Sequence, residues 1–271
     1  MAMEVRVAPI RIGREVAEYA RRHFPGELAK NPNYMAGNYE KALTETFLAI
    51  DNLLMTEAGL KEIHDLQNET NQLEEQSKNK NPLATLSDEG PEGKGCTANV
   101  ILIKNKVMYI ANAGDSRSVL AVKEHAIDLT IDHKPENDKE KARIAKAGGT
   151  VTNGRVEGNL NLSRALGDLR YKKNTSMKPE EQMITAMPDV YKQAISKDFD
   201  FVIMGCDGIY DQLSSQQIVD HFYKEMKAKP EAKLVTLVEN FLDSLVSPDY
   251  VKTEGAGCDN MTCLIIKFKK E

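Results

Sequence analysis

The sequence predicts an α+β protein, in which antiparallel strands and helices occupy separate parts of the chain. Short apolar runs bounded by turn residues are typical of strands, and they fill residues 98–122. Apolar residues at helical spacing mark two other regions, residues 14–64 and 215–245. The chain shows no internal repeat and no regular alternation of strand with helix, so we do not expect a sheet built from parallel strand–helix–strand units.

Composition indicates one globular domain spanning residues 1–271, with 41% hydrophobic and 28% charged residues. A net charge of −5 argues against a nucleic-acid partner, and no apolar run approaches the ~20 residues of a membrane span. The first residues lack the apolar stretch of a secretory signal, so we expect the cytoplasm or nucleus. The cysteines form no Cys-x-x-Cys pair and read as reduced thiols: Cys96, Cys206, Cys258 and Cys263.

The N-terminal third is predicted to be helical. Apolar residues recur at helical spacing over residues 14–30, and Pro25-Gly26 predicts that this helix ends or bends there. A second helix is expected from Tyr39 to about His64. Residues 67–94 are polar and rich in Pro and Gly toward their end, which predicts a surface loop that buries no core.

Strands and further helices follow. A hairpin is expected from two apolar runs, 98–103 and 106–111, because they flank Lys104-Asn105. The other predicted strands are 118–122, 201–204 and a closing strand at 261–268, and the other predicted helices are 137–146, 215–227 and 235–245.

The most informative stretch is the apolar run Phe201–Met204, which leads through Gly205 and Cys206 into Asp207-Gly208. The run predicts a buried strand. Burying a carboxylate at the end of such a strand costs free energy unless another group pairs with it. Asp207 reads either as a capped turn into the next helix or as a functional carboxylate.

A second carboxylate, Asp259, stands just before the closing strand. If the two strands are antiparallel neighbours, Asp207 and Asp259 meet at one edge of a sheet. Asp115 lies in another turn at a strand edge, and Asp211 follows Asp207 by one helical turn. An all-oxygen cluster suits Mg²⁺ or Mn²⁺ rather than zinc. Separate capped turns remain the alternative.

Seven segments, in order along the chain, resemble the motifs of the protein phosphatase 2C family: Gly95–Ala98, Ala113–Arg117, Asp132–Pro135, Gly154–Val156, Leu162–Asp168, Cys206–Asp211 and Asp259–Thr262. The resemblance runs from about Gly13 to the C-terminus. It implies a four-layer α-β-β-α sandwich with two central antiparallel sheets. It also implies a metal-dependent phosphatase that hydrolyses phosphoserine and phosphothreonine on proteins, with phosphorylated substrates or signalling proteins as partners.

By this resemblance, Asp207 and Asp259 are ligands of a pair of Mg²⁺ or Mn²⁺ ions, and Asp115 and Asp211 join Asp207 at a weaker third site. The implied mechanism is in-line attack on phosphorus by a metal-bound water. Within the Asp132–Pro135 and Leu162–Asp168 motifs, His133, Ser163, Arg164 and Asp168 read as framework residues, with His133 organising a turn.

The chain departs from the family at its start, where the family has two strands and an Asp-Gly-His-Gly-Gly motif. Gapless alignment puts Pro9 at the Asp position, which bridges both metals in the family, and Arg11 at the position of the general-acid His. We therefore expect incomplete N-terminal strands, no general-acid His and impaired activity. Three explanations are open. The chain is a truncated or alternatively spliced product, or it is a non-catalytic pseudophosphatase that binds partners, or segments outside this sequence complete the enzyme. The abrupt change at Gly13 favours the first.

Overall fold

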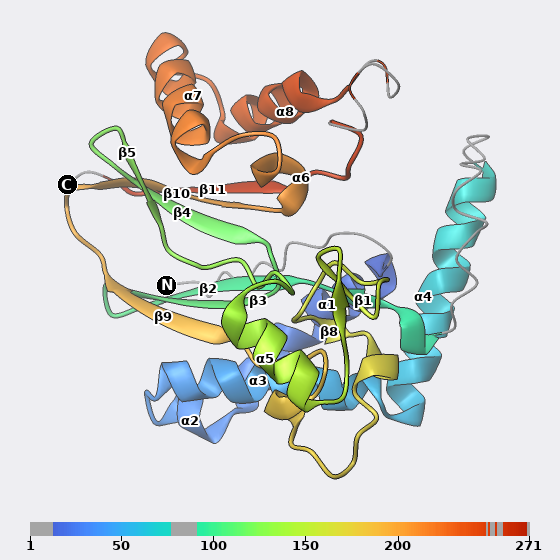
Figure 1. Cartoon of the computed structure of the whole chain (residues 1–271). Coiled ribbons are helices and arrows are strands. Elements are labelled where there is room, and N and C mark those ends of the chain that lie inside the picture. Colours follow the sequence, from blue (N-terminus) through green and yellow to red (C-terminus); the bar gives the residue numbers. More distant parts are fainter. Residues whose placement is uncertain (1–12, 77–90, 248, 250–252, 254–256, 270–271) are drawn as a thin grey trace.

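The computed structural model describes residues 13–76, 91–247, 249, 253 and 257–269. The chain forms four layers, with two antiparallel sheets between two layers of helices (Figure 1). This confirms the predicted α+β class and its layering. No helix within the described ranges is both long and apolar enough to span a membrane.

One sheet has four strands, in the order β11 (Cys263–Lys267), β10 (Phe199–Gly205), β4 (Arg117–Val122) and β5 (His125–Asp128). The other has three strands, in the order β2 (Ala98–Lys104), β3 (Val107–Ala113) and β9 (Asp189–Ala194). All neighbours are antiparallel, and β2 and β3 form the hairpin that was predicted around Lys104-Asn105.

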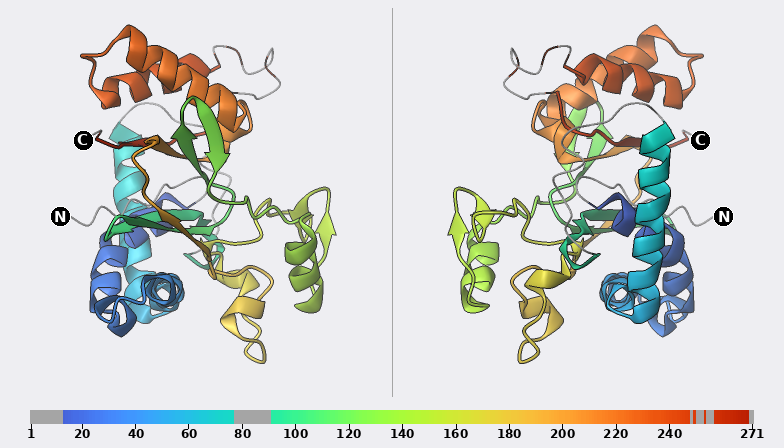
Figure 2. Two further views of the ribbon diagram at one scale, coloured as in Figure 1. Left: turned by 90° about the vertical axis from the view of Figure 1, so that its left-hand side faces the viewer. Right: turned by 90° about the vertical axis from the view of Figure 1, so that its right-hand side faces the viewer.

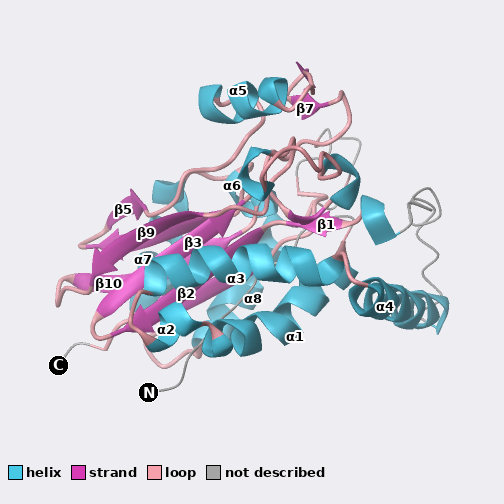
Figure 3. Cartoon of the chain, turned by 90° about the horizontal axis from the view of Figure 1, so that it is seen from below, coloured by secondary structure: helices cyan, strands magenta, loops and turns pink. Residues whose placement is uncertain are grey.

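The outer layers are helical. Helices α7 (Ser215–Ala228) and α8 (Leu234–Leu245) cover the four-stranded sheet, and they match two predicted helices closely. The three-stranded sheet is covered by α1 (Arg14–Lys30), α2 (Pro32–Met35) and α3 (Tyr39–Leu54), which lie across its face in Figure 3.

Strand β10 explains the continuous apolar run in the sequence. Phe201 and Ile203 pack toward α7 and α8, whereas Val202 and Met204 pack between the two sheets. A strand in the middle of a sheet with apolar layers on both faces needs apolar residues at every position. The expected buried strand before Asp207 is therefore confirmed.

A smaller part of the chain stands to one side of the sandwich (Figure 2). It contains α5 (Asp138–Lys146) and a hairpin of β6 (Val151–Thr152) and β7 (Arg155–Val156), and it has its own small apolar cluster around Ile144 and Ile184. Short segments complete the chain: 3₁₀ turns at Pro91–Gly93, Leu169–Tyr171 and Pro179–Glu181, and the strand pair β1 (Gly95–Cys96) and β8 (Leu166–Gly167).

Two helix predictions need correction. Helix α1 continues through Pro25-Gly26 to Lys30, because fully buried Phe24 and Leu28 anchor it on both sides of the proline. The helix expected from Tyr39 to His64 is two helices, since α3 ends at Leu54 and α4 (Glu57–Gln76) begins after Thr56. The hydroxyl of Thr56 accepts a hydrogen bond from the Gly59 N–H, which caps α4.

The polar stretch 67–94 was predicted as a loop, and its first ten residues are instead the end of α4. Buried Ile63 and Leu66 hold one side of this helix, and six of the ten residues that follow are Gln or Glu, which favour the helix. Residues 77–90 and the N-terminal positions Pro9 and Arg11 lie outside the described residues, so the incomplete N-terminal strands stay a prediction.

Candidate functional site

Three strand ends meet at one edge of the four-stranded sheet. Gly205, the last residue of β10, pairs with Cys263 at the start of β11 and with Arg117 at the start of β4. The antiparallel pairing expected for the Asp207 and Asp259 strands is thus confirmed. Asp207 follows β10, Asp259 precedes β11 and Asp115 precedes β4, so the register brings the three turns together.

Asp207 begins the short helix α6 (Asp207–Tyr210) and is 6% exposed. Burial raises its pKa to about 6, and the negative charges of Asp115 and Asp259 act in the same direction. Its Oδ1 also accepts the Gly208 N–H at 2.8 Å, as in a capped turn. A Cβ on Gly208 would lie 2.4 Å from the Asn260 carbonyl oxygen, so the two turns pack too closely for any larger residue. Asp207 is both a turn residue and a member of an acidic cluster.

Asp115 is the most buried acid of this cluster, at 1% exposure. The Nζ of Lys134 donates to its Oδ2 at 2.6 Å. Burial raises the pKa of Asp115 in spite of this partner. Burial is the largest single influence on Lys134 and lowers its pKa, but the charge and hydrogen bond of Asp115, together with the charges of Asp211 and Asp207, outweigh burial and leave the pKa raised.

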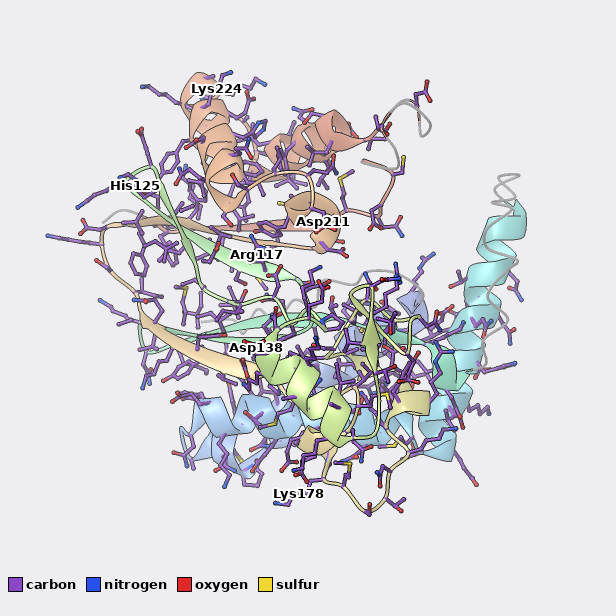
Figure 4. All side chains as sticks on the ribbon, viewed as in Figure 1. Arg117, His125, Asp138, Lys178, Asp211 and Lys224 are labelled. Carbon is purple, nitrogen blue, oxygen red and sulfur yellow. The ribbon has the colours of Figure 1, made fainter. Side chains whose placement is uncertain are left out.

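The other two predicted acids lie nearer solvent. Asp259 is half-buried and its Oδ1 accepts the Asn260 N–H at 2.7 Å. Asp211 is exposed just after α6, and Figure 4 labels it at the same end of the sheet as Arg117. Its negative charge acts on both Asp207 and Lys134. The four acids therefore share one electrostatic neighbourhood, which we call the acidic site (Asp115, Asp207, Asp211 and Asp259).

The acidic site is not a complete metal site in the described part of the chain. Among these residues, no group of three or more His, Cys, Asp or Glu side chains is arranged to hold a metal ion. The four acids offer the carboxylate oxygens that Mg²⁺ or Mn²⁺ would require. The ligand roles expected for the four acids stay predictions.

Two features of the site were not anticipated from the sequence. One is Lys134, whose sequence motif gave no sign that its ammonium reaches Asp115. The other is a pocket of about 480 Å³ beside the acidic site, with Lys134, Arg117, Ile131 and Tyr191 in its wall. Arg117 is held there by two hydrogen bonds to Asp132, of 3.0 and 2.8 Å. These contacts join residues 15 or more positions apart, and only folding defines them.

The predicted framework residues do hold the site in place. The Gly114 N–H donates to His133 Nδ1 at 3.2 Å, and the His133 N–H donates to the Gly114 carbonyl at 3.0 Å. His133 Nε2 lies 3.2 Å from Asp189, and the Ser163 hydroxyl donates to the His133 carbonyl at 2.8 Å. His133 therefore organises a turn, as expected.

Arg164 connects the same turn to α5. It donates to Glu140 at 2.6 Å and to Asp189 at 2.8 Å, and both Arg164 and Glu140 are buried. Cys206, next to Asp207, is fully buried, and burial raises the pKa of its thiol to about 11. Cys206 lies between β10 and α6 as a free thiol, in agreement with the reduced cysteines expected from the sequence.

Comparison with known proteins gives consistent matches. A family model described as Protein phosphatase 2C matches residues 5–246, which begins before Gly13 and ends before Asp259. The chain is 48% identical over 257 residues to "Probable protein phosphatase 2C 6" of Paramecium tetraurelia, covering 95% of this chain and 80% of that protein. It is 37% identical to "Probable protein phosphatase 2C 21" of Arabidopsis thaliana, covering 95% and 76%.

Solved structures agree on the fold. A phosphatase from Toxoplasma gondii superposes with a TM-score of 0.69 at 19% identity, covering 99% of this chain and 88% of that one. The sequence relatives, the family match across most of the chain and the shared sandwich lead to one conclusion. The chain belongs to the protein phosphatase 2C family.

Proposed function

We propose that this protein is a metal-dependent Ser/Thr phosphatase of the 2C type, acting on phosphoserine and phosphothreonine in proteins, with impaired activity in the chain as given. Family membership supports the reaction class, and the relatives are phosphatases by name. The observation that carries the proposal is the acidic site, where buried Asp207 is crowded by Asp115 and Asp259 at the end of β10. Carboxylates that are buried close together repel one another and cost stability, so their presence favours a functional origin.

Impairment is inferred from Pro9, which stands at the position of the family's bridging Asp, and from the described acids, which do not by themselves form a set of three metal ligands. A phosphorylated segment would find room in the pocket beside Lys134, whose wall carries the cations Lys134 and Arg117 together with the carboxylates Asp128 and Asp132. Those two cations attract a phosphate, but each is already paired with an aspartate.

A second candidate is a pseudophosphatase that binds phosphoproteins or signalling partners without hydrolysing them. The Asp115–Lys134 ion pair is the observation that favours it, because it occupies a carboxylate of the acidic site. The two candidates differ in whether Asp207 matters for turnover.

Hydrolysis of a phosphothreonine peptide with Mn²⁺ distinguishes them. The chain as given is compared with Asp207→Ala and with Asp198→Ala, which removes an exposed carboxylate just before β10 and serves as the matched control. An impaired phosphatase gives a slow rate that Asp198→Ala retains and Asp207→Ala loses. If all three proteins release phosphate at the background rate, the enzyme proposal fails for this chain and the binding role is favoured.

A further inference from the structure

We propose that the pocket beside the acidic site binds a lysine or arginine side chain of the phosphoprotein substrate, close in sequence to the phosphorylated residue. This inference rests on the proposed function, because it names the class of phosphorylated segment that the same site selects. Three observations on the described residues carry it: the place of the pocket, the charge that its wall leaves unpaired, and the apolar surface beside that charge.

The pocket and the acidic site share a residue. Lys134 lines the pocket, and its Nζ lies 2.6 Å from Oδ2 of Asp115 in the acidic site. The pocket has a volume of about 480 Å³, which is within the ~300–1,000 Å³ of ordinary ligand sites. Successive residues of an extended peptide stand only ~3.3–3.6 Å apart. A peptide with its phosphorylated residue at the acidic site therefore brings a nearby side chain to the pocket.

Four charged side chains line the pocket, and three of them already have a partner of opposite charge. Arg117 donates two hydrogen bonds to Asp132, at 3.0 and 2.8 Å. Lys134 donates to Asp115 outside the pocket wall. The two cations of the wall are thus bound to aspartates of the protein itself, and a ligand that sought either cation would have to compete with that aspartate.

The fourth charged side chain is Asp128, which is exposed. In the described part of the chain its hydrogen-bond donor is the neutral hydroxyl of Ser215, at 2.6 Å. Its charge also acts on Arg117, but that guanidinium donates to Asp132 and to Ser215. The wall therefore presents one carboxylate whose charge is left for a ligand to balance, and complementary charge is what gives such a site its specificity.

Apolar surface lies beside this carboxylate. Leu129, Ile131 and Tyr191 line the same pocket, and Ile131 is 64% exposed. The Leu129 N–H donates to the Ser118 carbonyl at 2.8 Å, and the Thr130 hydroxyl accepts the Ser118 N–H at 3.0 Å, so this part of the wall is fixed before a ligand binds. Lysine and arginine pack their aliphatic stems on apolar surface, and aromatic rings attract their charged ends.

Other ligands satisfy only part of this wall. A second phosphate group would meet the like charge of Asp128, and a purely apolar side chain would cover Ile131 but take water from the carboxylate without replacing it. A side chain with an aliphatic stem and a positive end satisfies the apolar surface and the charge together. The pocket therefore selects phosphorylated segments that carry a nearby lysine or arginine.

The experiment measures the binding of fluorescent peptides by anisotropy in MnCl₂. Each peptide carries a non-hydrolysable phosphonate analogue of phosphothreonine, and an arginine, norleucine or glutamate is moved through the positions around it. Norleucine keeps an aliphatic stem without the charge. The unchanged chain is compared with Asp128→Asn, Asp128→Lys and Ile131→Ser. Asp198→Asn is the matched control, because Asp198 is a solvent-accessible aspartate just before β10, at the opposite end of the sheet from the pocket.

At one or more positions we expect the arginine peptide to bind at least about fivefold more tightly than the norleucine peptide, and the glutamate peptide to bind most weakly. Asp128→Asn should bring arginine and norleucine to within about twofold of each other, and Asp128→Lys should favour glutamate. Ile131→Ser should weaken arginine and norleucine alike, because both lose the contact to the stem. Asp198→Asn should keep the arginine preference, which should shrink as NaCl is raised.

Three results would overturn the inference. One is the absence of any position at which arginine is preferred, including failure of every peptide to bind. Another is an arginine preference that Asp128→Asn retains. The third is tighter binding of the glutamate peptide to the unchanged chain, which would indicate an anion-binding pocket.

The phosphothreonine hydrolysis assay separates this inference from the proposed function. Hydrolysis without an arginine preference contradicts the pocket's selectivity alone. An arginine preference that depends on Asp128, without hydrolysis, contradicts the enzyme proposal alone.

Discussion

At the scale of single residues, Glu140 is a buried carboxylate held by two arginines. It is 1% exposed and accepts hydrogen bonds from Arg143, Arg164 and Ser163. Burial alone would raise its pKa, but the two guanidinium groups outweigh burial and lower the pKa to about 2. A carboxyl whose pKa is lower in the folded than in the unfolded chain stabilises the fold above its ordinary pKa, near 4.5, and loses that contribution as the pH falls toward 2.

We therefore expect Glu140→Gln to be less stable at pH 7 by about 3–5 kcal/mol, because Arg143 loses its carboxylate partner and buried Arg164 keeps only Asp189 among the described carboxylates. The unchanged chain should lose about 3 kcal/mol through this group between pH 5 and pH 2, and the variant should lack that part of the decline. Urea unfolding at a series of pH values measures both. Parallel decline of the two proteins with falling pH would show that Glu140 is not the group responsible.

At the scale of elements, Asp51 connects helix α3 to the segment that carries β8. Its carboxylate accepts from Lys172 Nζ at 2.8 Å and from the Gly167 N–H at 2.8 Å. The side chains of Asp51 and Lys172 are 9% and 4% exposed, so the pair is screened from water. Gly167 has a φ of 77°, and a Cβ there would lie 2.4 Å from the Lys94 carbonyl oxygen, so the strand pair β1–β8 depends on this close approach.

Asp51→Ala and Lys172→Met should each destabilise the chain by about 3–5 kcal/mol, since each leaves a buried charge unpaired. The double variant should cost less than the sum of the two, with a coupling energy of more than about 1 kcal/mol. Lys41→Ala is the control, because Lys41 pairs with Glu45 at 3.8 Å on an exposed helix face and should cost less than about 0.5 kcal/mol. Additive single effects at Asp51 and Lys172 would contradict this account.

At the scale of the whole molecule, sheet order decides which strands tolerate change. β11 is the edge of the four-stranded sheet in the described structure, and β10 lies between two neighbours. The Phe268 N–H donates to the carbonyl oxygen of Asp200 in β10. The Cys206 N–H, just after β10, donates to the carbonyl oxygen of Thr262. Because pairing alternates along an antiparallel strand, the N–H of Lys267 points away from β10.

Lys267→Pro should thus lower the free energy of unfolding by less than about 1 kcal/mol, because proline removes an N–H that makes no hydrogen bond to β10. Ile203→Pro in β10 should lower the free energy of unfolding by more than about 3 kcal/mol or prevent folding, since the Ile203 N–H faces Val119 of β4. Lys267→Ala controls for loss of the side chain. Thermal unfolding of the three variants tests the order of the strands, and equal damage by the two prolines would refute it.

Much of the fold could be predicted because local pattern and burial agree. The β2–β3 hairpin, strand β10 and helices α7 and α8 lie where the apolar periodicity put them. The errors have local causes that compete with that pattern. Pro25 read as a helix end but is held inside α1 by buried neighbours, and the cap at Thr56 divided what looked like one helix. Strands β5 and β9 were missed, because neither contains a fully buried residue and so neither shows an apolar run.

For the site, the sequence by itself determined which acids could act together. Asp207, Asp259 and Asp115 each stand at the end of an apolar strand, and the ordered motifs around them indicated the family. Tertiary structure alone decided how close the acids come and what neutralises them. The register of β10 with β11 and β4 brings the turns together, and the His133–Gly114 contact carries Lys134 to Asp115. An ion pair between residues far apart in the sequence forms only if folding places their backbones to within about an ångström. The local sequence around each residue does not determine the distance between them.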